Sequence, residues 1–466
     1  METRPTTFDP NAPAPGLFLD PEEWANLKDH LEDPFFADLH RRSTALLDRV
    51  FSGELPEKRE GRILRKCRVL KNLVQRGSVA WHLTGDERYR DLAIDTLMDA
   101  CGQSWEPIYR HHGIGIRHAD LGTGEMMYLV SFGLDAMHDE LSADQRRICV
   151  EALAQNGLAR YFAGIEAEDW WVRCNFNWNS ALHGNAGIAG LALRHHAPEL
   201  SEKALQSAHD GLQHMIDAYF EGGGWTEGAM YFGTATGHLT DFAYVHRRVT
   251  GDDLGVLSNS DLHDSIDFFL TMHGGDGGVY NFSNCYASPW VRPFVFWYAR
   301  HLNRPDWAAD QQRKIEDGEL DRISVLFGDI DSFWYREPFQ KALPASIQGL
   351  RHFEDIDWLA WRGERSWLGF RSGFNGGNHN NRDLGQFIFG LGETRYLVDP
   401  GYGAGHPSQH NCPTVRNKDQ ADGATAKITE LRELRGGFRL TCDIQEAFPH
   451  VLKHYDRHLA VVDDQH

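Results

Sequence analysis

The stretch FEDIDWLAWRGERSWLGFRSG, residues 353–373, is where the chain changes from a helical to a strand-like pattern. Aromatic and polar residues alternate in it around a turn, as they do in two antiparallel strands. The stretch GQFIFGLGETRYLVDPG, residues 385–401, repeats this arrangement, with GLGE as its turn. Residues 437–448 and 455–463 are also strand-like. These segments predict an antiparallel β-domain in the last part of the chain.

The first two thirds of the chain carry helical patterns instead. Ser142, followed by Gln145 three residues later, has the form of a capping box at a helix start. After Ser201, apolar residues recur at three- and four-residue spacings, as in a helix that buries one face; they are Leu205, Ala208, Leu212, Met215, Ile216 and Tyr219. Successive helices of this kind, joined by Gly-rich loops, predict an array of helical hairpins.

We place the domain boundary near residues 325–350, and we assign residues 1–335 to the helical domain and residues 336–466 to the β-domain. Two domains agree with a length of 466 residues, which exceeds the usual size of one hydrophobic core. The β-domain has the length of a small complete domain. The alternative is that it is the first, truncated part of a larger one.

The composition is that of a globular protein, with 41% hydrophobic and 24% charged residues. The formal net charge of −20 argues against a nucleic-acid partner, which would require a basic surface. A local cluster of Arg and His could still bind an anionic substrate. No apolar run approaches the roughly 20 residues that span a bilayer, so no membrane partner is expected. The oligomeric state stays open.

The cysteines and the N-terminus bear on the compartment. Seven cysteines without a CxxC motif predict scattered, reduced thiols rather than a disulfide framework. The first residues do not form a basic segment followed by an apolar one, as a secretory signal would. We therefore expect a cytoplasmic protein, or a periplasmic or secreted one whose leader has been removed.

A first candidate site is the polar stretch GGNHNNRDLGQF, residues 376–387. As the entrance to a strand, it would place His379, Asn381 and Asp383 on one face. An imidazole beside a carboxylate can act as a base, with the carboxylate setting its tautomer. The alternative is a solvated loop capped by Asn and Asp.

A second candidate is DWWVRCNFNWNSALHGNAG, residues 169–187, which is crowded with polar and aromatic residues: Trp170, Trp171, Asn175, Asn177, Trp178, Asn179, His183 and Asn185. Asparagines favour helix starts over helix interiors, so a helix N-terminus aimed into a cleft is expected. Its amides could hold a carboxylate, and tryptophans offer flat faces to sugar rings. The alternative is an ordinary helix cap with tryptophans in the core.

A third candidate is GGGWTEGAMYFGTATGH, residues 222–238, in which Glu227 precedes Tyr231 by four residues. A tyrosine hydroxyl can donate a proton to a leaving oxygen, or accept one when cations lower its pKa. The alternative is a half-buried tyrosine that packs a helix. Further residues could supply local positive potential: Arg110, His111, His112, Arg117, His118, Arg173, Arg371 and Arg382.

Taken in order, these segments resemble the heparinase II/III-like polysaccharide lyases. The family's β-domain carries a segment of the form HNHNDVGSF, then a strand, a turn and DPG, and residues 379–403 follow that layout. QHNCPTV, residues 409–415, resembles its AHNTV-like element. NFNWNSALHGNAG resembles its NNWN-type segment, and GGGWTEGAMYF resembles its DGGYxEGxxY segment. The resemblance covers most of the chain.

The resemblance implies an (α/α) toroid followed by an antiparallel β-sandwich. It implies β-elimination at the uronic acid of an anionic poly- or oligosaccharide, of glycosaminoglycan or alginate type, which leaves a 4,5-unsaturated uronate. In these terms Asn177 neutralises the uronate carboxylate, with Asn179 or His183 as replacements. Tyr231 protonates the leaving oxygen and in some members removes the C5 proton, and His379 is a base or second neutraliser. Residues expected to contact substrate are Arg173, Trp178, Asn179, Glu227, Arg371, Asp383 and His410.

One departure concerns a metal. In several family members, the second histidine of the HxHxD pattern helps to bind a structural zinc, together with the DPG aspartate and a later histidine. Here that position is Asn381, whereas Asp399 is retained and His450 or His454 could be the later ligand. An amide oxygen is a poor zinc ligand, so calcium, manganese or no metal is as well supported. The elimination itself requires no metal.

Two alternative functions stay open. A glycoside hydrolase on the same toroid would use an acid/base pair drawn from Asp120, Glu125 and Glu227. A non-catalytic carbohydrate-binding relative is the other. The presence of Asn177 together with the Tyr231 and His379 segments argues against it.

Overall fold

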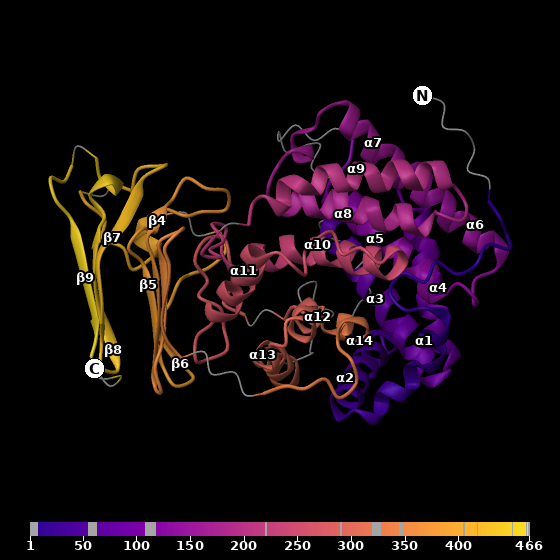
Figure 1. Ribbon diagram of the computed structural model, residues 1–466, viewed down its shortest axis with the longest axis horizontal. Coiled ribbons are helices and arrows are strands. Elements are labelled where there is room, and N and C mark those ends of the chain that lie inside the picture. The colour runs from indigo at the N-terminus through magenta and orange to yellow at the C-terminus, as the bar shows by residue number, and fades with distance from the viewer. Residues whose placement is uncertain are drawn as a thin grey trace. The chain divides into compact units, whose positions relative to one another are not determined.

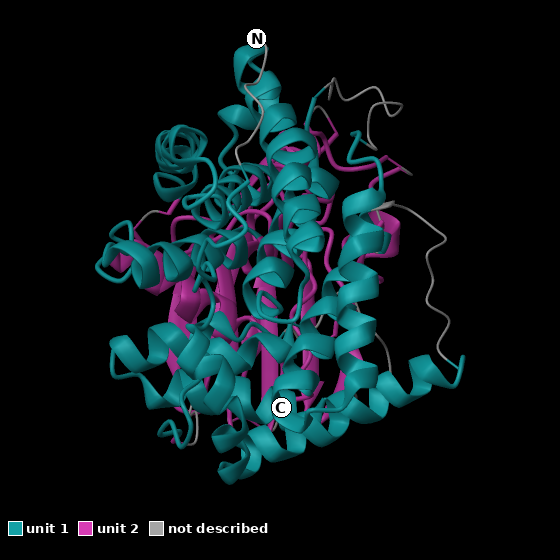
Figure 2. Cartoon of the chain, turned by 90° about the vertical axis from the view of Figure 1, so that its right-hand side faces the viewer, with its two compact units in different colours: residues 1–218, 235–258, 291–342 teal, residues 219–234, 259–290, 343–466 magenta. Residues whose placement is uncertain are grey.

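The computed structural model describes residues 8–54, 63–107, 118–219, 221–288, 291–318, 328–343, 348–403, 406–416, 418–449, 451–462 and 464 (Figure 1). The chain divides into two compact units (Figure 2). Unit 1 comprises Met1–Ala218, Ala235–Ser258 and Val291–Ala342, and unit 2 comprises Tyr219–Thr234, Asn259–Trp290 and Leu343–His466. Unit 2 thus holds the β-strands together with two segments from the helical part of the sequence.

Unit 1 is the predicted array of helical hairpins, an (α/α) toroid. Its longer helices are α2 (Pro34–Phe51), α3 (Ile63–Thr84), α4 (Glu87–Gly102), α5 (Leu121–Ala136), α6 (Ala143–Glu151), α7 (Ala159–Glu166), α8 (Asn177–Ala192), α9 (Pro198–Ile216), α12 (Phe294–His301) and α13 (Pro305–Asp317). Shorter ones are α1 (Pro21–Asn26), η1 (Leu27–Glu32), η3 (Ala152–Leu158), η4 (Trp170–Val172), η5 (Asp329–Asp331) and α14 (Ser332–Tyr335). Helix α10 (Ala229–Thr250) begins in unit 2 and continues into unit 1.

The sequence signals for these helices are confirmed where they were clear. The Ser142 side chain accepts a hydrogen bond from the Gln145 backbone N–H, and the Gln145 side chain completes the capping box of α6. The apolar stripe after Ser201 lies in α9 as far as Ile216, and the helix buries Ala208, Leu212 and Met215 among others, whereas Tyr219 follows its end.

Two helices at the centre of unit 1 are buried along their whole length. All residues of α5 and of α8 are buried. Glycines allow this close packing: a Cβ on Gly124 of α5 would lie 2.6 Å from the carbonyl oxygen of Ala181 in α8. A Cβ on Gly184 would lie 2.8 Å from the carbonyl oxygen of His238. The small residues of the HGNAGIAG segment therefore serve to seat α8, whose first turn carries the candidate asparagines.

The strands of unit 2 form two antiparallel sheets. The first has the order β1 (Gly349–Phe353), β2 (Trp358–Arg362), β3 (Ser366–Arg371), β5 (Phe387–Leu391) and β6 (Thr394–Leu397). The second has the order β4 (Gly373–Phe374), β7 (Thr425–Leu434), β8 (Gly437–Asp443) and β9 (Asp456–Val461). Short 3₁₀ turns lie at η6 (Pro407–Gln409) and η7 (Gln445–Ala447). The pairs β2–β3 and β5–β6 are the two hairpins that the sequence predicts.

The two sheets pack face to face as a β-sandwich. One hydrophobic cluster contains residues of both, including Leu359 and Phe370 from the first sheet and Phe438 and Leu440 from the second. Burying such side chains stabilises a fold by roughly 1.5–3 kcal/mol each. The fold class predicted from the sequence, an (α/α) toroid followed by an antiparallel β-sandwich, is therefore confirmed.

The helical segments of unit 2 pack on the first sheet. Phe268 of α11 (Ser260–Thr271) meets the ring of Trp358 with centroids 6.1 Å apart. The ring of Tyr280 lies against Gly369, where an added Cβ would come within 2.6 Å of it. These aromatic contacts explain why residues 259–290 belong to the same compact unit as the strands.

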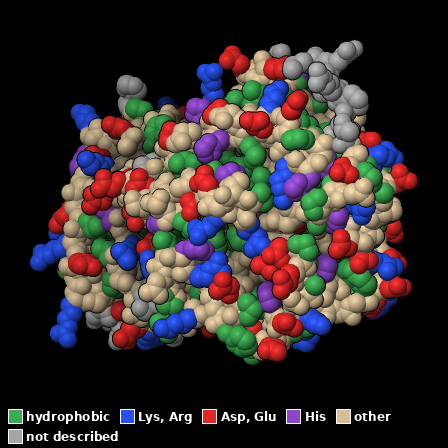
Figure 3. All heavy atoms as spheres, turned by 45° about the vertical axis from the view of Figure 1, so that its right-hand side comes forward, with side chains coloured by type: hydrophobic (Ala, Val, Ile, Leu, Met, Phe, Trp, Pro, Cys, Tyr) green, Lys and Arg blue, Asp and Glu red, His purple; other side chains and the backbone are tan. Residues whose placement is uncertain are grey.

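The surface carries both signs of charge. Acidic and basic side chains are scattered across the face seen in Figure 3, with histidines between them. Among the helices of the described residues, none is both long and apolar enough to cross a membrane.

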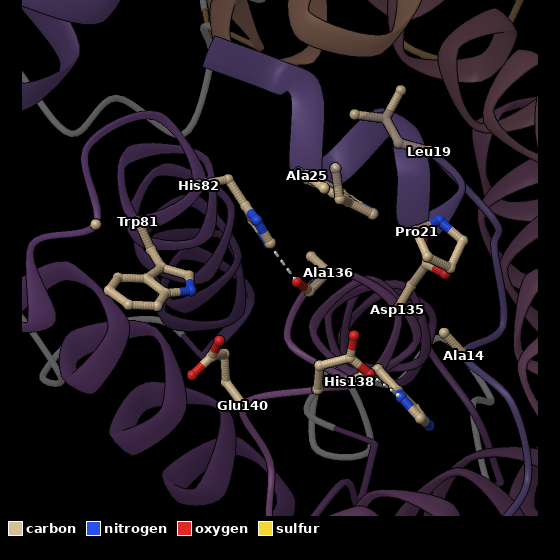
Figure 4. A pocket seen from close by; sticks show the side chains of 13 residues that line it. Ala14, Leu19, Pro21, Ala25, Trp81, His82, Asp135, Ala136, His138 and Glu140 are labelled. Carbon is tan, nitrogen blue, oxygen red and sulfur yellow. Dashed lines mark hydrogen bonds and ion pairs between the residues drawn. The ribbon is translucent and has the colours of Figure 1, made fainter.

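One cavity in unit 1, of about 340 Å³, is lined by Trp81, His82, Asp135 and His138 among other residues (Figure 4). His82 Nε2 lies 2.7 Å from the carbonyl oxygen of Ala136. The Asp135 carboxylate accepts hydrogen bonds from the backbone of residues 17 and 18. These polar groups hold neighbouring segments of the toroid, and we assign the cavity no function.

Candidate active site

Tyr231 and His379 meet in unit 2 and form the centre of the candidate site. Tyr231 lies in the first turn of α10. This helix begins directly after Gly228, whose φ of +82° suits glycine. The imidazole of His379 lies flat on the Tyr231 ring, with centroids 3.7 Å apart and an interplanar angle of 11°. Two residues predicted separately from two sequence motifs are thus in direct contact.

The loop around His379 is not the strand entrance that alternation suggested. Strand β5 begins only at Phe387, and His379 has a φ of +59°. A non-glycine residue in this region costs about 1–3 kcal/mol and persists only when its surroundings fix it. Here the Asn284 backbone N–H donates to the His379 carbonyl oxygen (2.9 Å), and the Ser283 hydroxyl donates to Asn380 Oδ1 (2.9 Å). These two bonds hold the strained loop that places His379 against Tyr231.

The carboxylate nearest to His379 is that of Glu227, not that of Asp383. Glu227 Oε1 lies 3.9 Å from His379 Nε2 and accepts a hydrogen bond from Asn378 Nδ2 (2.7 Å). The Glu227 side chain is only 3% exposed. Burial raises the pKa of Glu227 to about 7, although the hydrogen bond from Asn378 lowers it. Burial lowers the pKa of His379 to about 4, so its imidazole is neutral at pH 7.

Tyr402 is a residue that the sequence interpretation missed. Its hydroxyl oxygen lies 3.1 Å from that of Tyr231. Its ring stacks on that of Tyr286, with centroids 5.2 Å apart and planes inclined by 16°. The sequence did hold a signal for this residue. Tyr402 follows directly after the DPG segment, residues 399–401, which lies close to His379 in the sequence.

Arg371 and Asp383 form a fully buried ion pair in unit 2. Their described partners are protein groups, and the guanidinium also lies over the Trp358 ring, 5.4 Å from its centroid. Asp383 was expected to support His379, but this partnership with Arg371 takes its place. A contact of either residue with substrate stays a prediction.

Asp399 and His410 lie next to this pair. Asp399 Oδ2 is hydrogen-bonded to His410 Nδ1 (2.8 Å) and accepts from Gln386 Nε2, while Oδ1 accepts from the Gly401 backbone N–H (2.6 Å). Asn281 Nδ2 donates to the Asp399 carbonyl oxygen (3.2 Å). This network fixes the turn that leads to Tyr402.

The same cluster could hold a divalent metal ion. Asp383, Asp399 and His410 are buried and offer ligand atoms that all lie within 4.8 Å of one another. Two buried oxygens, Asp383 Oδ2 and Gln386 Oε1, have no hydrogen-bond partner within the described part of the chain. A cation bound by Asp383 Oδ2 would satisfy that oxygen. This set shares Asp399 with the predicted one, whereas Asn381 as a ligand stays a prediction and His450 lies outside the described residues.

Asn177 is the first residue of α8 in unit 1, and its side chain is 4% exposed. Its Oδ1 has no hydrogen-bond partner among the described residues. The Oδ1 of Asn179 likewise has no partner among the described residues, but its Nδ2 donates to the carbonyl oxygens of Gly211 (3.0 Å) and Val172 (3.3 Å). Of the two amides, that of Asn179 is engaged in holding the fold.

His183 is enclosed by protein groups on both ring nitrogens. Its Nδ1 lies 2.6 Å from the Tyr161 hydroxyl and its Nε2 lies 3.1 Å from the carbonyl oxygen of Val172. Burial lowers its pKa to about 4. A side chain on Gly211 would collide with this ring, with a Cβ only 2.1 Å away. These contacts give His183 a structural part, and the catalytic role stays a prediction.

The other predicted residues in and near this segment differ in exposure. Arg173 is exposed and pairs with Glu168 at 3.2 Å. Trp178 is buried against the half-exposed Trp170, with ring centroids 5.0 Å apart. His118 Nδ1 lies 3.2 Å from the Asp169 carboxylate. Their contacts with substrate stay predictions.

The carboxylates proposed for the hydrolase alternative have protein partners. Asp120 caps α5 by accepting hydrogen bonds from the backbone of Gly122 and Thr123. Glu125 is paired with Arg68 Nε and Lys71 Nζ, each at 2.8 Å. Burial acts to raise the pKa of Glu125, but these two cations outweigh it and hold the pKa well below its ordinary value. Glu125 is therefore ionised at neutral pH and unsuited to act as a general acid.

Some of the Arg and His residues predicted to supply positive potential or bind a metal form ion pairs at the surface, and others lie outside the described residues. Arg382 pairs with Asp419 and Asp422, and His454 pairs with Asp456. Residues outside the described ranges are Arg110, His111, His112, Arg117 and His450.

No protein-family model matches the chain, and no curated protein matches its sequence. Solved structures do match. A heparinase III with methylated lysines has a TM-score of 0.56 at 12% identity, over 84% of this chain and 61% of that one. Another heparinase III has a TM-score of 0.55 at 12% identity, over 86% of this chain and 61% of that one.

The heparan sulfate lyase HepC from Pedobacter heparinus has a TM-score of 0.53 at 12% identity, over 86% of this chain and 60% of that one. The chain therefore spans about three fifths of the length of these proteins. At this identity the likeness concerns the fold alone. The chain has the fold of heparinase III and related polysaccharide lyases.

Proposed function

We propose that this protein is a lyase that cleaves uronic-acid-containing poly- or oligosaccharides, of glycosaminoglycan or alginate type, by β-elimination. The observation that carries the proposal is the contact of Tyr231 with His379, which brings a phenol and a neutral imidazole together. The heparinase III fold supports the same class of substrate.

The reaction needs three kinds of group. The C5–H bond of the uronate breaks, its electrons form the C4–C5 double bond, and the C4–O4 bond breaks as the leaving oxygen takes a proton. Negative charge develops on the uronate carboxylate, so hydrogen-bond donors must stabilise it. A base must accept the C5 proton, and an acid must supply the proton to the leaving oxygen.

Our assignment gives Tyr231 the proton donation to the leaving oxygen. His379 accepts the C5 proton or hydrogen-bonds the carboxylate, and its low pKa keeps it in the neutral form that both tasks begin from. Glu227 lies behind His379, at 3.9 Å, and stabilises the imidazolium if His379 takes the proton. Asn177 is assigned the neutralisation of the carboxylate, as the family resemblance implies.

The buried cluster around Asp399 has a supporting role in this proposal. A divalent ion held by Asp383, Asp399 and His410 would neutralise their charge and stiffen the turn before Tyr402. Oxygen donors predominate in this cluster, which favours calcium or manganese over zinc. The elimination itself is carried out by side chains.

The test is a panel of uronate glycans incubated with the purified protein, read by the ultraviolet absorbance of the unsaturated uronate. Heparan sulfate, chondroitin, hyaluronan and alginate would cover the main sugar types. We expect absorbance to grow with at least one of them. New reducing ends without absorbance would favour the hydrolase alternative, with Glu227 as its acid because its pKa of about 7 suits that task.

A further inference from the structure

Tyr286 and Tyr402 form an exposed pair of stacked rings at the edge of the site. Their exposed fractions are 47% and 45%, although their rings are nearly parallel. Large aromatic side chains that stay open to solvent contribute little to the core and are common where a ligand binds. The exposure of both rings therefore suits a site where a bound ligand covers them.

The backbone that carries this pair is held in place. Gly401 has a φ of +88°, and an added Cβ would lie 3.2 Å from the carbonyl oxygen of Cys285. The turn before Tyr402 therefore lies directly against the segment before Tyr286. The Asp399 carboxylate fastens the turn by accepting the Gly401 N–H. Because both tyrosines sit on fixed backbone, binding a ligand to them would cost little ordering entropy.

Tyr402 is also joined to the reactive phenol. Its hydroxyl lies 3.1 Å from the Tyr231 hydroxyl, whereas His379 covers one face of the Tyr231 ring. We propose that Tyr402 and Tyr286 bind the sugar ring on the leaving side of the scissile bond, and that the Tyr402 hydroxyl orients that of Tyr231. This inference rests on the proposed elimination at Tyr231.

The chemistry of the pair selects the leaving sugar rather than the uronate. A carboxylate needs cations or several hydrogen-bond donors when it loses water, and the faces of two phenol rings carry neither. The face of an uncharged pyranose presents C–H groups that pack on an aromatic ring while its hydroxyls stay hydrated. The ligand class is therefore an uncharged hexose or N-acetylhexosamine ring, so within the proposed function the subsite fits the glycosaminoglycan type and not alginate, whose leaving sugar is a second uronate.

The hydroxyl of Tyr402 adds a positioning role. When Tyr231 gives its proton to the leaving oxygen, its own O–H bond breaks and a new O–H bond forms on the sugar. The Tyr402 O–H can donate a hydrogen bond to the resulting phenolate without losing its proton. Tyr402 thus stabilises the charge that remains on Tyr231 until a proton returns.

The first experiment uses calorimetric binding to protein that carries Tyr231→Phe, so that ligands are not consumed. The probes are two uronosides that differ only at O4, one bearing a hexose and the other a methyl group. Tyr286→Ala should weaken binding of the hexosyl ligand about tenfold, equivalent to about 1.4 kcal/mol, and leave the methyl ligand unchanged. Tyr396→Ala is the matched control, since Tyr396 is 60% exposed on strand β6.

The second experiment measures turnover of the glycan that the wild type cleaves fastest. Tyr402→Phe keeps the ring and should lower kcat at unchanged KM, whereas Tyr402→Ala should also raise KM. If adding Tyr286→Ala to the Tyr231→Phe protein leaves the affinity for both uronosides unchanged, or weakens both equally, the subsite is overturned. Absence of unsaturated product with every uronate glycan would overturn the proposed function, and the subsite with it.

Discussion

His379 lies flat on Tyr231, with ring centroids 3.7 Å apart and planes inclined by 11°. The two residues come from the start of α10 and from the loop before β5, and the contact brings both into one compact unit. The strained backbone of His379, with its φ of +59°, indicates that the protein holds this ring in one place. The predictions below test what that arrangement and its neighbours do.

Replacing Tyr231 with Phe should lower kcat by a factor of about 10²–10⁴, because the proton donor to the leaving oxygen is lost. The ring contact with His379 would stay, so Tm should not change. Initial rates from the absorbance of the unsaturated product measure the effect. Tyr396→Phe is the control and should keep full activity; an equally active Tyr231→Phe protein would contradict the assignment.

Asn177 and Asn179 form a matched pair that separates chemistry from folding. Asn177→Ala should lower kcat by roughly 10²-fold at unchanged Tm, since the variant lacks the amide N–H donor that we assign to the substrate carboxylate. Asn179→Ala should instead cost about 1–3 kcal/mol of stability, because it removes the hydrogen bonds that the buried Nδ2 donates to the carbonyl oxygens of Gly211 and Val172. The measurements are kcat and Tm for both variants. A loss of stability in Asn177→Ala with a loss of kcat alone in Asn179→Ala would exchange the two roles.

The raised pKa of Glu227 predicts that the free energy of unfolding depends on pH. Its pKa is about 7 in the folded protein against an ordinary value of 4.5, so the folded state keeps the proton longer than the unfolded state. Stability is therefore fully present below about pH 4.5 and falls as the pH rises toward 7, by roughly 3 kcal/mol in total. Glu227→Gln cannot ionise and should escape this loss.

The measurement is the difference in Tm between Glu227→Gln and wild type across this pH range. We expect the variant to gain on the wild type as the pH rises, and the exposed Glu393→Gln to show no such trend. A difference that does not vary with pH would mean that Glu227 titrates alike in the folded and unfolded protein, so that folding does not raise its pKa.

The cluster of Asp383, Asp399 and His410 predicts a bound divalent ion. Elemental analysis of the purified protein should find about one calcium or manganese per chain, and a chelator should lower Tm. Asp399→Asn should lose the ion and its effect on Tm together. A metal-free protein whose Tm does not respond to chelator or to added ions would show that hydrogen bonds alone hold this cluster.

Much of the fold could be predicted because its signals are local. The hairpins β2–β3 and β5–β6 are recognisable in the sequence, because aromatic and polar residues alternate around a turn in each. Strand β7 does not, since TAKITELREL is rich in helix formers and buries only Ala426 and Ile428. Its pairing with β8 overrides that local preference.

The candidate site was only partly predictable, for a related reason. Tyr231 and His379 each lie in a recognisable motif. The backbone conformation of His379, the contact of Glu227 with Asn378 and the hydroxyl contact of Tyr402 with Tyr231 depend on residues far apart in the chain. No local pattern carries such information. The sequence therefore suggests Asp383 as the support of His379, whereas its partner in the structure is Arg371.

The central claim is that the glycosidic bond breaks by elimination and not by addition of water. The most direct measurement is digestion of the cleaved uronate glycan in water enriched in heavy oxygen, followed by mass spectrometry of the first products. Elimination predicts that neither fragment contains oxygen from the solvent and that one fragment carries the unsaturated uronate. One solvent oxygen in each pair of fragments would show hydrolysis and would contradict the account.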